Sequence, residues 1–257
     1  MPDKDFSNKQ QKNLIIGRNP VTEALKSGRE IDKIYITQGE PSGSLVTIIK
    51  QARNKKIVVK EVPQKKLDFM SAGNVHQGVI AVVPAQSYCS VEDIINYAKE
   101  KNEVPFIVIC DGIEDPHNLG AIIRTAEATG VHGIIIPKRR SVTVNFTVAK
   151  ASSGALEYMN ISKVTNISDT IDFLKENGFW IYGADMDGES WCQTDYTSPT
   201  AIVIGSEGHG ISRLVKSKCD GIISMPMCGK INSLNASVAA GVIMYEVFRQ
   251  RLNMDKK

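Results

Sequence analysis

The 257-residue sequence predicts a soluble α/β protein in two parts. Short apolar runs of strand length alternate with segments of helical periodicity along most of the chain. A stretch without clear periodicity, which begins at Pro84, separates a shorter alternating part from a longer one. In the longer part the strands are continuously apolar, which is typical of a mostly parallel sheet covered by helices on both faces.

The first part is expected to be a small α/β domain. Pro20 suits the start of a helix, and Gly28 suits its end. The elements expected after it are a strand over 31–37, a helix over 44–56, a strand over 57–62, a short helix over 64–71 and a strand over 78–83. We therefore expect a flexible polar tail over 1–13, a domain over 14–83 and a linker over 84–90.

The second part, residues 91–257, is expected to be a larger α/β domain. Its expected helices cover 91–101, 121–130 and about 235–251, and another is expected to start at Ser212. Its expected strands cover 105–113, 131–137, 179–185, 200–206 and 219–226. In such sheets, ligands bind at the loops beyond the carboxyl ends of the strands. The polar loops that follow these strands are therefore the candidates for a functional site.

Charge divides unevenly between the two parts. Residues up to Pro84 contain 14 Lys and Arg against 8 Asp and Glu, a net of +6, whereas the remainder has 17 against 20, a net of −3. A basic first part suggests contact with a polyanion. Lysines that merely solvate a surface explain so small a difference equally well.

Composition excludes several classes of protein. No apolar run approaches the length of a membrane span, and the polar N-terminus lacks the apolar core of a signal peptide, so a cytoplasmic protein is expected. The five cysteines are scattered, with no C-x-x-C pair, and the four histidines include no i,i+4 pair. A metal site is therefore not expected, and the thiols are expected to be buried and reduced.

The first candidate loop, DGIEDPHNLG, follows the strand that ends near Cys110. Asn118 and Gly120 open a helix there, and Arg124 lies six residues beyond Asn118, about one and two-thirds turns on. Their side chains are expected on different faces near the same helix end. Taken alone, Asn118 suits a helix cap and Arg124 a surface salt bridge.

The second candidate loop lies within AIVIGSEGHGIS. Gly205, Gly208 and Gly210 follow a buried strand in the order G-x-x-G-x-G. A dinucleotide-binding oxidoreductase requires G-x-G-x-x-G and a ribose-binding acid, so that class is excluded. These glycines let a ligand approach the backbone, and Glu207 would repel a phosphate, so a neutral or cationic ligand fits better.

The third candidate loop ends at Ser233, Leu234 and Asn235, directly before a helix with a face of small residues. Either Ser233 or Asn235 suits the N-cap of that helix. One cap does not require several polar side chains and a glycine turn. The excess predicts that this loop binds a ligand.

Together the three loops resemble the motifs of the SpoU family of RNA ribose 2′-O-methyltransferases, in the TrmH/RlmB-like part of the SPOUT superfamily. The matching stretches are N-x-G-x-x-x-R-T-A (Asn118–Ala126), I-G-x-E-G-x-G (Ile204–Gly210) and S-L-N-x-S-V-A (Ser233–Ala239). Further similarity lies in PKRRS, SSGALE, GRNPVTEAL and HQG. The last two resemble the subgroup with an added RNA-binding domain, whose best-known members modify a guanosine of 23S rRNA. Ala236 and Met225 depart mildly from the pattern.

The resemblance implies a deep C-terminal trefoil knot, S-adenosylmethionine as cofactor and a homodimer. It implies transfer of a methyl group to a ribose 2′-hydroxyl of structured RNA, most readily rRNA, with tRNA as the alternative. A non-catalytic RNA-binding protein is a rival of a different class. That rival predicts decayed catalytic loops, whereas the motif residues are all present in this chain.

The resemblance also assigns roles to residues. It implies cofactor contacts for Gly205, Met225 and Leu234. The implied catalytic group is Asn118, Arg124, Glu207, Ser233 and Asn235. A guanidinium stays charged at neutral pH, so Arg124 suits a grip on phosphate better than a general base, although the family proposal of a base stays open.

Contacts to RNA are expected from two places in the chain. Lys138, Arg139 and Arg140 follow a strand end, and Arg18 lies in the basic first part. An ordinary solvated turn is the alternative for the basic triplet. Its position beside a motif-bearing strand favours contact with RNA.

Overall fold

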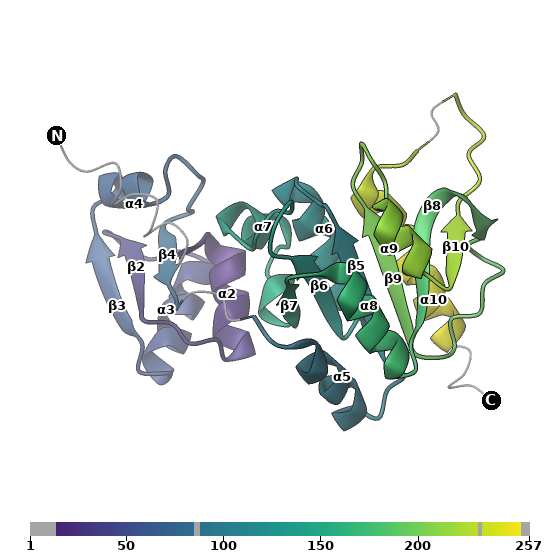
Figure 1. Ribbon diagram of the computed structural model, residues 1–257. Coiled ribbons are helices and arrows are strands. Elements are labelled where there is room, and N and C mark those ends of the chain that lie inside the picture. The colour runs from purple at the N-terminus through teal and green to yellow at the C-terminus, as the bar shows by residue number, and fades with distance from the viewer. Residues whose placement is uncertain (1–13, 85–87, 231–232, 253–257) are drawn as a thin grey trace. The chain divides into compact units, whose positions relative to one another are not determined.

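The computed structural model describes residues 14–84, 88–230 and 233–252. The tail expected over 1–13, the middle of the expected linker (85–87) and Asn232 lie outside these residues. The chain forms two compact units. The first contains the described residues up to Pro84 together with Val144–Tyr158, and the second contains Tyr88–Thr143 and the described residues from Met159 onward (Figure 1). The α/β class expected from the sequence is confirmed.

The first unit is built on a four-stranded sheet with the order β1-β4-β2-β3. Its strands are β1 (Leu14–Ile16), β2 (Lys33–Thr37), β3 (Val58–Val62) and β4 (Val79–Val82). Strand β4 runs antiparallel to β1 and β2, and β2 runs parallel to β3. Helices α2 (Arg18–Ser27) and α3 (Ser44–Asn54) pack on one face, while α4 (Gln64–Met70) packs on the other.

A segment from the middle of the sequence, Val144–Tyr158, packs with the first unit. It contains α7 (Phe146–Ala151), which packs near β1, and the 3₁₀ turn η1 (Ala155–Glu157), which packs near α2. The half-buried pair of Arg29 and Glu157, with 2.5 Å between nitrogen and oxygen, joins the two stretches. Nothing in the sequence pattern indicated this packing. The domain limits expected from the sequence stay a prediction.

The second unit is built on a six-stranded, wholly parallel sheet with the order β10-β8-β9-β5-β6-β7. Its strands are β5 (Phe106–Asp111), β6 (Gly133–Pro137), β7 (Ile161–Val164), β8 (Trp180–Ser190), β9 (Thr200–Gly205) and β10 (Gly221–Ser224). The two central strands, β5 and β9, are buried over almost their whole length, as their apolar runs predict. The mostly parallel sheet expected from the sequence is confirmed. The trefoil knot stays a prediction.

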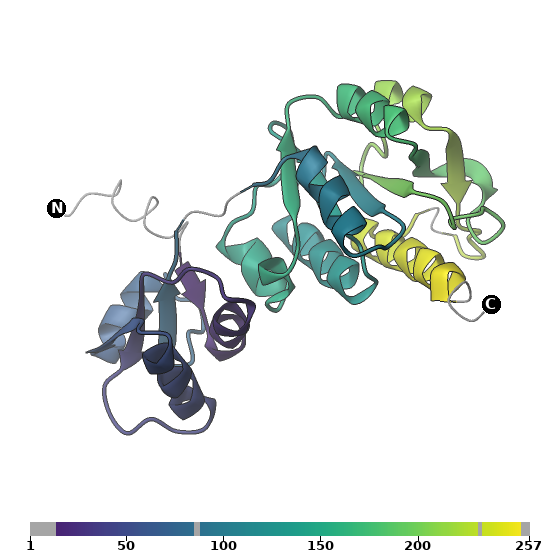
Figure 2. The same cartoon turned by 90° about the horizontal axis from the view of Figure 1, so that it is seen from below.

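Helices cover both faces of this sheet (Figures 1 and 2). On one face lie α5 (Val91–Glu100), α8 (Ile167–Glu176) and α9 (Arg213–Lys218), whose apolar residues share one core with β5 and β9. On the other face α6 (Pro116–Ala128) packs against α10 (Ala236–Leu252). The carboxyl ends of the strands stay open for the loops that carry the motifs.

The sequence patterns located most elements to within a few residues, with three kinds of exception. β1, α7, β7 and α8 were not expected, because they are short or their apolar residues are interspersed with polar ones. β8 continues to Ser190, beyond its expected end. Helix α6 begins at Pro116, earlier than the expected start between 118 and 121, because Asp115 caps it and proline suits its first turn.

The cysteines are free, but the expectation that all are buried holds only for Cys110, since Cys89 and Cys219 are half-buried and Cys192 and Cys228 are exposed. Burial raises the pKa of Cys219 to about 11. Among the helices that the structure describes, none combines the length and apolar character that crossing a bilayer requires. Within the same residues, no group of three or more His, Cys, Asp or Glu is placed to hold a metal ion.

A buried histidine makes the stability of the second unit depend on pH. His132 is 3% exposed; its Nδ1 accepts a hydrogen bond from the Phe106 amide at 3.0 Å, and its Nε2 lies 2.9 Å from Glu103. Burial lowers the pKa of His132 despite the nearby carboxylate. The unfolded chain therefore takes up this proton first as pH falls. The stabilisation is fully present above the usual histidine pKa of about 6.5 and is lost as pH falls through the lower folded value.

We expect the free energy of unfolding to decrease as pH falls from about 7 to about 5, and the His132→Gln variant to show a shallower decrease. Denaturant titrations across this range measure both slopes. His117→Gln, which changes an exposed histidine, is the matched control and should retain the wild-type slope. Equal slopes for wild type and His132→Gln would contradict the assignment.

Candidate active site

The candidate site lies where the carboxyl ends of β5 and β9 meet. These strands pair in parallel, with Asp111 opposite Gly205 in the register. The loop after β5 leads into α6, and the loop after β9 contains Glu207. The loop before α10 joins them, because α10 packs against α6. Three motifs far apart in the sequence thus converge on one edge of the sheet.

Three side chains, one from each motif, form a closed hydrogen-bond network. The Nδ2 of Asn118 donates to Oε1 of Glu207 at 2.9 Å. The Nδ2 of Asn235 donates to the same carboxylate oxygen at 2.5 Å and to Oδ1 of Asn118 at 2.9 Å. Hydrogen bonds to a carboxylate are the stronger kind. The network therefore holds Glu207 in a fixed position and fixes the orientation of both amides.

Helix α6 presents Asn118 to this network. The N-cap is Asp115, whose Oδ1 accepts from the His117 amide at 2.9 Å, so the capping role that Asn118 alone would suit is wrong. Asn118 lies within the first turn and is 6% exposed. A buried amide without partners would cost free energy, and the network supplies them. Asn118 is thus a buried side chain oriented by Glu207 and Asn235.

Asn235 has two tasks at the start of α10. Its Oδ1 accepts from the Ser237 amide at 2.9 Å, the Val238 amide at 3.3 Å and the Ser237 hydroxyl at 2.6 Å. This is the capping geometry expected for one of the polar residues of the loop. The opposite end of the amide, Nδ2, is directed to Glu207 and Asn118. One side chain therefore fixes the start of the helix and completes the network.

The glycines after β9 allow a very tight turn. A Cβ atom at Gly205 would lie 2.1 Å from the carbonyl carbon of Gly210 and 2.3 Å from the amide of Ile211. Ser206 and Gly210 exchange backbone hydrogen bonds at 3.0 and 2.9 Å, and Gly210 has a φ of +63°. The loop folds back on the end of its own strand and brings Glu207 to the edge of the sheet. No larger residue fits at Gly205 without moving this backbone.

Two cavities adjoin the network, and the loop 206–210 borders both. The smaller has a volume of about 440 Å³ and lies between that loop, β10 and the start of α10. Its lining includes Gly205, Met225, Ser233 and Leu234, four of the residues singled out from the sequence. Two carboxylates, Asp185 and Glu207, also line it. The cavity is thus mainly apolar with acidic groups at its edge.

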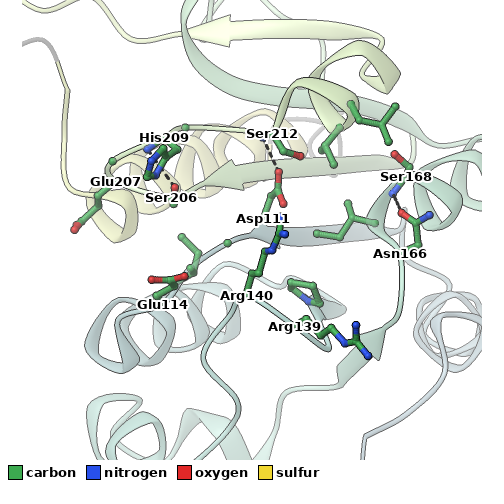
Figure 3. Close-up of a pocket in the computed structure, with 18 of the residues that line it drawn as sticks. Asp111, Glu114, Arg139, Arg140, Asn166, Ser168, Ser206, Glu207, His209 and Ser212 are labelled. Atoms are coloured by element: carbon green, nitrogen blue, oxygen red, sulfur yellow. Dashed lines mark hydrogen bonds between the residues drawn. The ribbon is translucent and has the colours of Figure 1, made fainter.

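The larger cavity, about 890 Å³, lies on the other side of the same loop. Glu207 and Asn118 form part of its wall, and Arg139 and Arg140 line it from the turn after β6 (Figure 3). The exposed Lys138 does not line this cavity and donates to the Thr165 hydroxyl at 3.0 Å. Of the three basic residues 138–140, both arginines therefore line the cavity, and the lysine does not.

Two expected site residues lie outside the network. Arg124 is exposed on α6 and lines neither cavity beside the network. Ser233 lines the smaller cavity rather than joining the three hydrogen-bonded side chains. In the first unit, the Arg18 guanidinium donates to the carbonyls of Gln77 at 2.9 Å and Ser42 at 3.2 Å, so it braces two loops. The functional roles of these residues stay predictions.

Sequence reasoning missed Asp111. Its Oδ2 accepts from the Ser212 amide at 2.8 Å, which ties the end of β5 to the start of α9, and it lines the larger cavity. The signal was available, because a carboxylate at the carboxyl end of a buried parallel strand stands where ligands bind. Asp185 of the smaller cavity lies at a similar place in β8, and Lys216 pairs with it at 2.7 Å.

The model of the SpoU rRNA Methylase family matches residues 105–245, which include all three motifs and the network. The chain belongs to the SpoU family. A second model, described as RNA 2′-O ribose methyltransferase substrate binding, matches residues 14–89. This SpoU protein is therefore an RNA methyltransferase with an added N-terminal substrate-binding region, and the resemblance seen in the motifs is confirmed.

Curated relatives are similar to this chain over nearly its whole length. YacO of Bacillus subtilis, named for the TrmH family of tRNA/rRNA methyltransferases, is 50% identical over 243 residues, or 94% of this chain and 97% of the relative. A Staphylococcus aureus protein named for the same family is 51% identical over 243 residues, or 93% and 96%. Among solved structures, the SpoU methyltransferase AviRb of Streptomyces viridochromogenes, in complex with AdoMet, has a TM-score of 0.80 at 25% identity. That comparison covers 98% of this chain and 95% of AviRb.

Proposed function

We propose that this SpoU protein transfers a methyl group from S-adenosylmethionine to the 2′-hydroxyl of a ribose in structured RNA, with a guanosine of 23S rRNA as the substrate. The observation that carries the proposal is the network of Asn118, Glu207 and Asn235, which stands between two cavities of different character. One cavity suits a small cofactor and the other an RNA nucleotide. A transfer between two ligands requires such an arrangement.

The smaller cavity fits the methyl donor. Its volume of about 440 Å³ lies within the roughly 300–1,000 Å³ of small-molecule sites. Met225 and Leu234 offer apolar contact, and the tight turn at Gly205 exposes backbone groups. Asp185 and Glu207 place negative charge at the edge, which suits a sulfonium cation. When bound, S-adenosylmethionine supplies an electrophilic methyl group on its positively charged sulfur.

The residues of the network serve to position the ribose hydroxyl. Displacement at a methyl group requires the attacking oxygen to be aligned with the bond that breaks, and positioning supplies about 7–11 kcal/mol of barrier lowering in favourable cases. Glu207, held by both amides, faces both cavities. Ser233, in the wall of the cofactor cavity, and Asn235 orient the hydroxyl. Arg124 holds a phosphate and offsets the negative charge that develops on the oxygen.

RNA contacts are proposed at two surfaces. In the second unit, Arg139 and Arg140 line the larger cavity, with Lys138 beside it. In the first unit, the region matched as substrate binding contains Arg18 and has a basic excess. We assign the first unit to recognition of the RNA as a whole and the second unit to methyl transfer. A requirement for the 2′-hydroxyl restricts the enzyme to RNA.

We also propose that the protein works as a homodimer through α6 and α10. A groove of about 830 Å³ along these helices is lined mainly by apolar and small side chains, and Val238 and Tyr245 are 50% and 53% exposed there. Arg124 lies three residues beyond Ala121, which lines this groove, so a partner bound in the groove would bring the Arg124 guanidinium close to the interface. Sedimentation equilibrium tests the dimer, and the mass of a single chain at micromolar concentration would overturn it.

The proposed reaction is tested with labelled methyl donor. We expect the purified chain to transfer label from S-adenosylmethionine to unmodified 23S rRNA, and nuclease mapping to place the label on a ribose 2′-oxygen of a guanosine. Arg124→Ala should lower the rate on the order of 100-fold, because a donor to developing negative charge is lost. Label on tRNA instead would keep the chemistry and change the substrate. Absence of label from both RNAs would favour a non-catalytic binding protein.

A further inference from the structure

The larger cavity contains two side chains of opposite charge, Asp111 and Arg140, to which the methyl-transfer step itself assigns no part. Asp111 and Arg140 both line it, and both lie away from the cofactor cavity. Figure 3 shows Arg140 directed toward Asp111 in the middle of the cavity, whereas Arg139 is directed away from it. Arg139, one residue earlier, therefore provides a natural comparison for the role of Arg140.

The backbone holds Asp111 in a defined orientation. Asp111 is the last residue of β5, and its Oδ2 accepts a hydrogen bond from the Ser212 amide at 2.8 Å. That bond fixes the plane of the carboxylate. The second oxygen, Oδ1, is available to a ligand in the cavity. A carboxylate held by a backbone amide loses little conformational freedom when it binds.

The turn after β6 holds the backbone of Arg140 close to the residues that follow Asp111. The Ser141 hydroxyl donates to the Ile113 carbonyl at 3.0 Å, and the Val142 amide donates to the same carbonyl at 2.9 Å. The position of a Cβ atom on Gly112 would lie 3.8 Å from the Arg140 carbonyl oxygen. Arg140 also has a φ of +55°, an uncommon conformation for a residue with a side chain. The turn therefore places the Arg140 backbone next to the end of β5, and its side chain lines the cavity.

Asp111, Arg140 and Glu207 line one cavity, whose volume of about 890 Å³ is large enough for a nucleotide. Glu207 lies two residues beyond Gly205, the register partner of Asp111, so the two carboxylates come from the ends of adjacent strands. A ribose positioned at Glu207 and Asn118 would direct its base toward Asp111 and Arg140. A phosphate of the same nucleotide would lie on the other side of the sugar.

We propose that Asp111 and Arg140 read the base of the target nucleotide and select guanine, an inference that rests on the proposed methyl transfer to a ribose in this cavity. Guanine presents two adjacent donors, N1–H and the N2 amino group, and next to them the acceptor O6, followed by N7. A carboxylate accepts from the donors, and an arginine donates to O6 and N7, as it does in the commonest specific contact to guanine. Asp111 and Arg140 therefore offer an acceptor for the N1–H and N2 donors of guanine and a donor for its O6 and N7.

The same pair rejects adenine and cytosine by chemistry rather than by size. Adenine would place its N1 acceptor against the Asp111 carboxylate and its N6 amino donors against the Arg140 guanidinium, so both contacts would be mismatched. Cytosine, with an N3 acceptor and an N4 amino group, fails in the same way. Hypoxanthine retains N1–H and O6 but lacks the N2 amino group, so it should bind with intermediate strength.

Nucleotide binding tests this reading independently of methyl transfer. The full chain with S-adenosylhomocysteine is titrated with guanosine, inosine and adenosine 5′-monophosphates, and binding is followed by ligand-observed NMR. We expect guanosine monophosphate to bind on the order of tenfold more tightly than adenosine monophosphate, with inosine monophosphate between them. A preference for guanine without any transfer to RNA would count against the proposed reaction and leave the base reading in place.

Variants separate base reading from general electrostatics. Asp111→Asn keeps an acceptor for the Ser212 amide but presents donors to guanine, and it should remove the preference. Arg140→Gln should reduce the preference in the same direction. The matched controls are Glu114→Gln, which removes one negative charge from the same cavity wall, and Arg139→Gln; both should leave the guanine-to-adenine ratio unchanged. Equal binding of all three nucleotides to wild type, or equal loss of the ratio in the controls, would overturn the proposal.

Discussion

Replacing Asn235 by aspartate is expected to lower kcat/KM for methyl transfer on the order of 100-fold while the fold remains intact. The wild-type amide donates from Nδ2 to Glu207 and Asn118. In aspartate, a carboxylate oxygen would replace the Nδ2 atom that now lies 2.5 Å from Oε1 of Glu207. Two negatively charged oxygens would then face each other, and the attraction would become repulsion between like charges. Glu207 and Asn118 would then be repelled from residue 235, and the edge shared by the two cavities would lose its geometry.

The substitution is informative because aspartate keeps the other task of this residue. Asn235 caps α10 through Oδ1, and aspartate is an equally good cap. The midpoint of thermal unfolding should therefore change little, which separates loss of activity from loss of fold. Initial rates with labelled donor at subsaturating RNA measure the effect.

Ser237→Ala supplies the control, since its hydroxyl bonds only to the capping oxygen of Asn235 among the described residues. We expect a small loss of stability and a rate within a few-fold of wild type. If Asn235→Asp retained the wild-type kcat/KM in a folded protein, the network would have no part in the reaction.

The sequence predicted which residues belong to the site, but not how their side chains are arranged. Asn118, Glu207 and Asn235 were expected to act together, and the structure joins them by three hydrogen bonds. Their spacing along the chain carries no information about which oxygen each amide faces. That information depends on the register of β5 with β9 and on the packing of α10 against α6, both of which are long-range.

Local signals predicted the fold where a single segment determines its own structure. Gly28 ends α2 in a left-handed conformation with a φ of 78°, as a glycine after the last helical turn indicates. The packing of Val144–Tyr158 with the first unit could not be predicted in this way. It depends on partners such as Arg29 and Glu157, which are 128 residues apart in sequence. Asp111 was missed for a related reason, because its partner Ser212 lies 101 residues away.

The largest expected effect on stability comes from Arg251, near the C-terminal end of α10. Its guanidinium donates to four backbone carbonyls, at distances of 2.5 to 3.1 Å, and it lies 5.2 Å from the centre of the Phe106 ring. The four carbonyls belong to Val104, Pro105, Tyr196 and Ser198. Burial lowers the pKa of Arg251 to about 10, so the group remains charged at neutral pH. One side chain therefore ties α10 to the segments that precede β5 and β9.

Arg251→Ala is expected to lower the free energy of unfolding of the second unit by roughly 3 kcal/mol, because several charge-assisted hydrogen bonds are lost and their carbonyls are left without partners. Arg251→Lys should recover only part of this, since an ammonium lacks the forked geometry. The two tryptophans, Trp180 and Trp191, both lie in the second unit, so their fluorescence during denaturant titration reports on that unit alone.

Arg249→Ala is the matched control on the same helix. Arg249 pairs with Glu246 at 2.7 Å; the Arg249 side chain is 60% exposed and the Glu246 side chain 5% exposed. Gln250 also donates to the Glu246 carboxylate at 2.9 Å, so that carboxylate keeps one partner when Arg249 is removed. We therefore expect Arg251→Ala, which leaves four carbonyls without this donor, to destabilise the unit more than Arg249→Ala. Because Asn235 stands at the other end of α10, a loosened C-terminal anchor should also weaken the network of the site. Equal destabilisation by the two variants would show that the four carbonyl contacts contribute no more than the pair of Arg249 and Glu246.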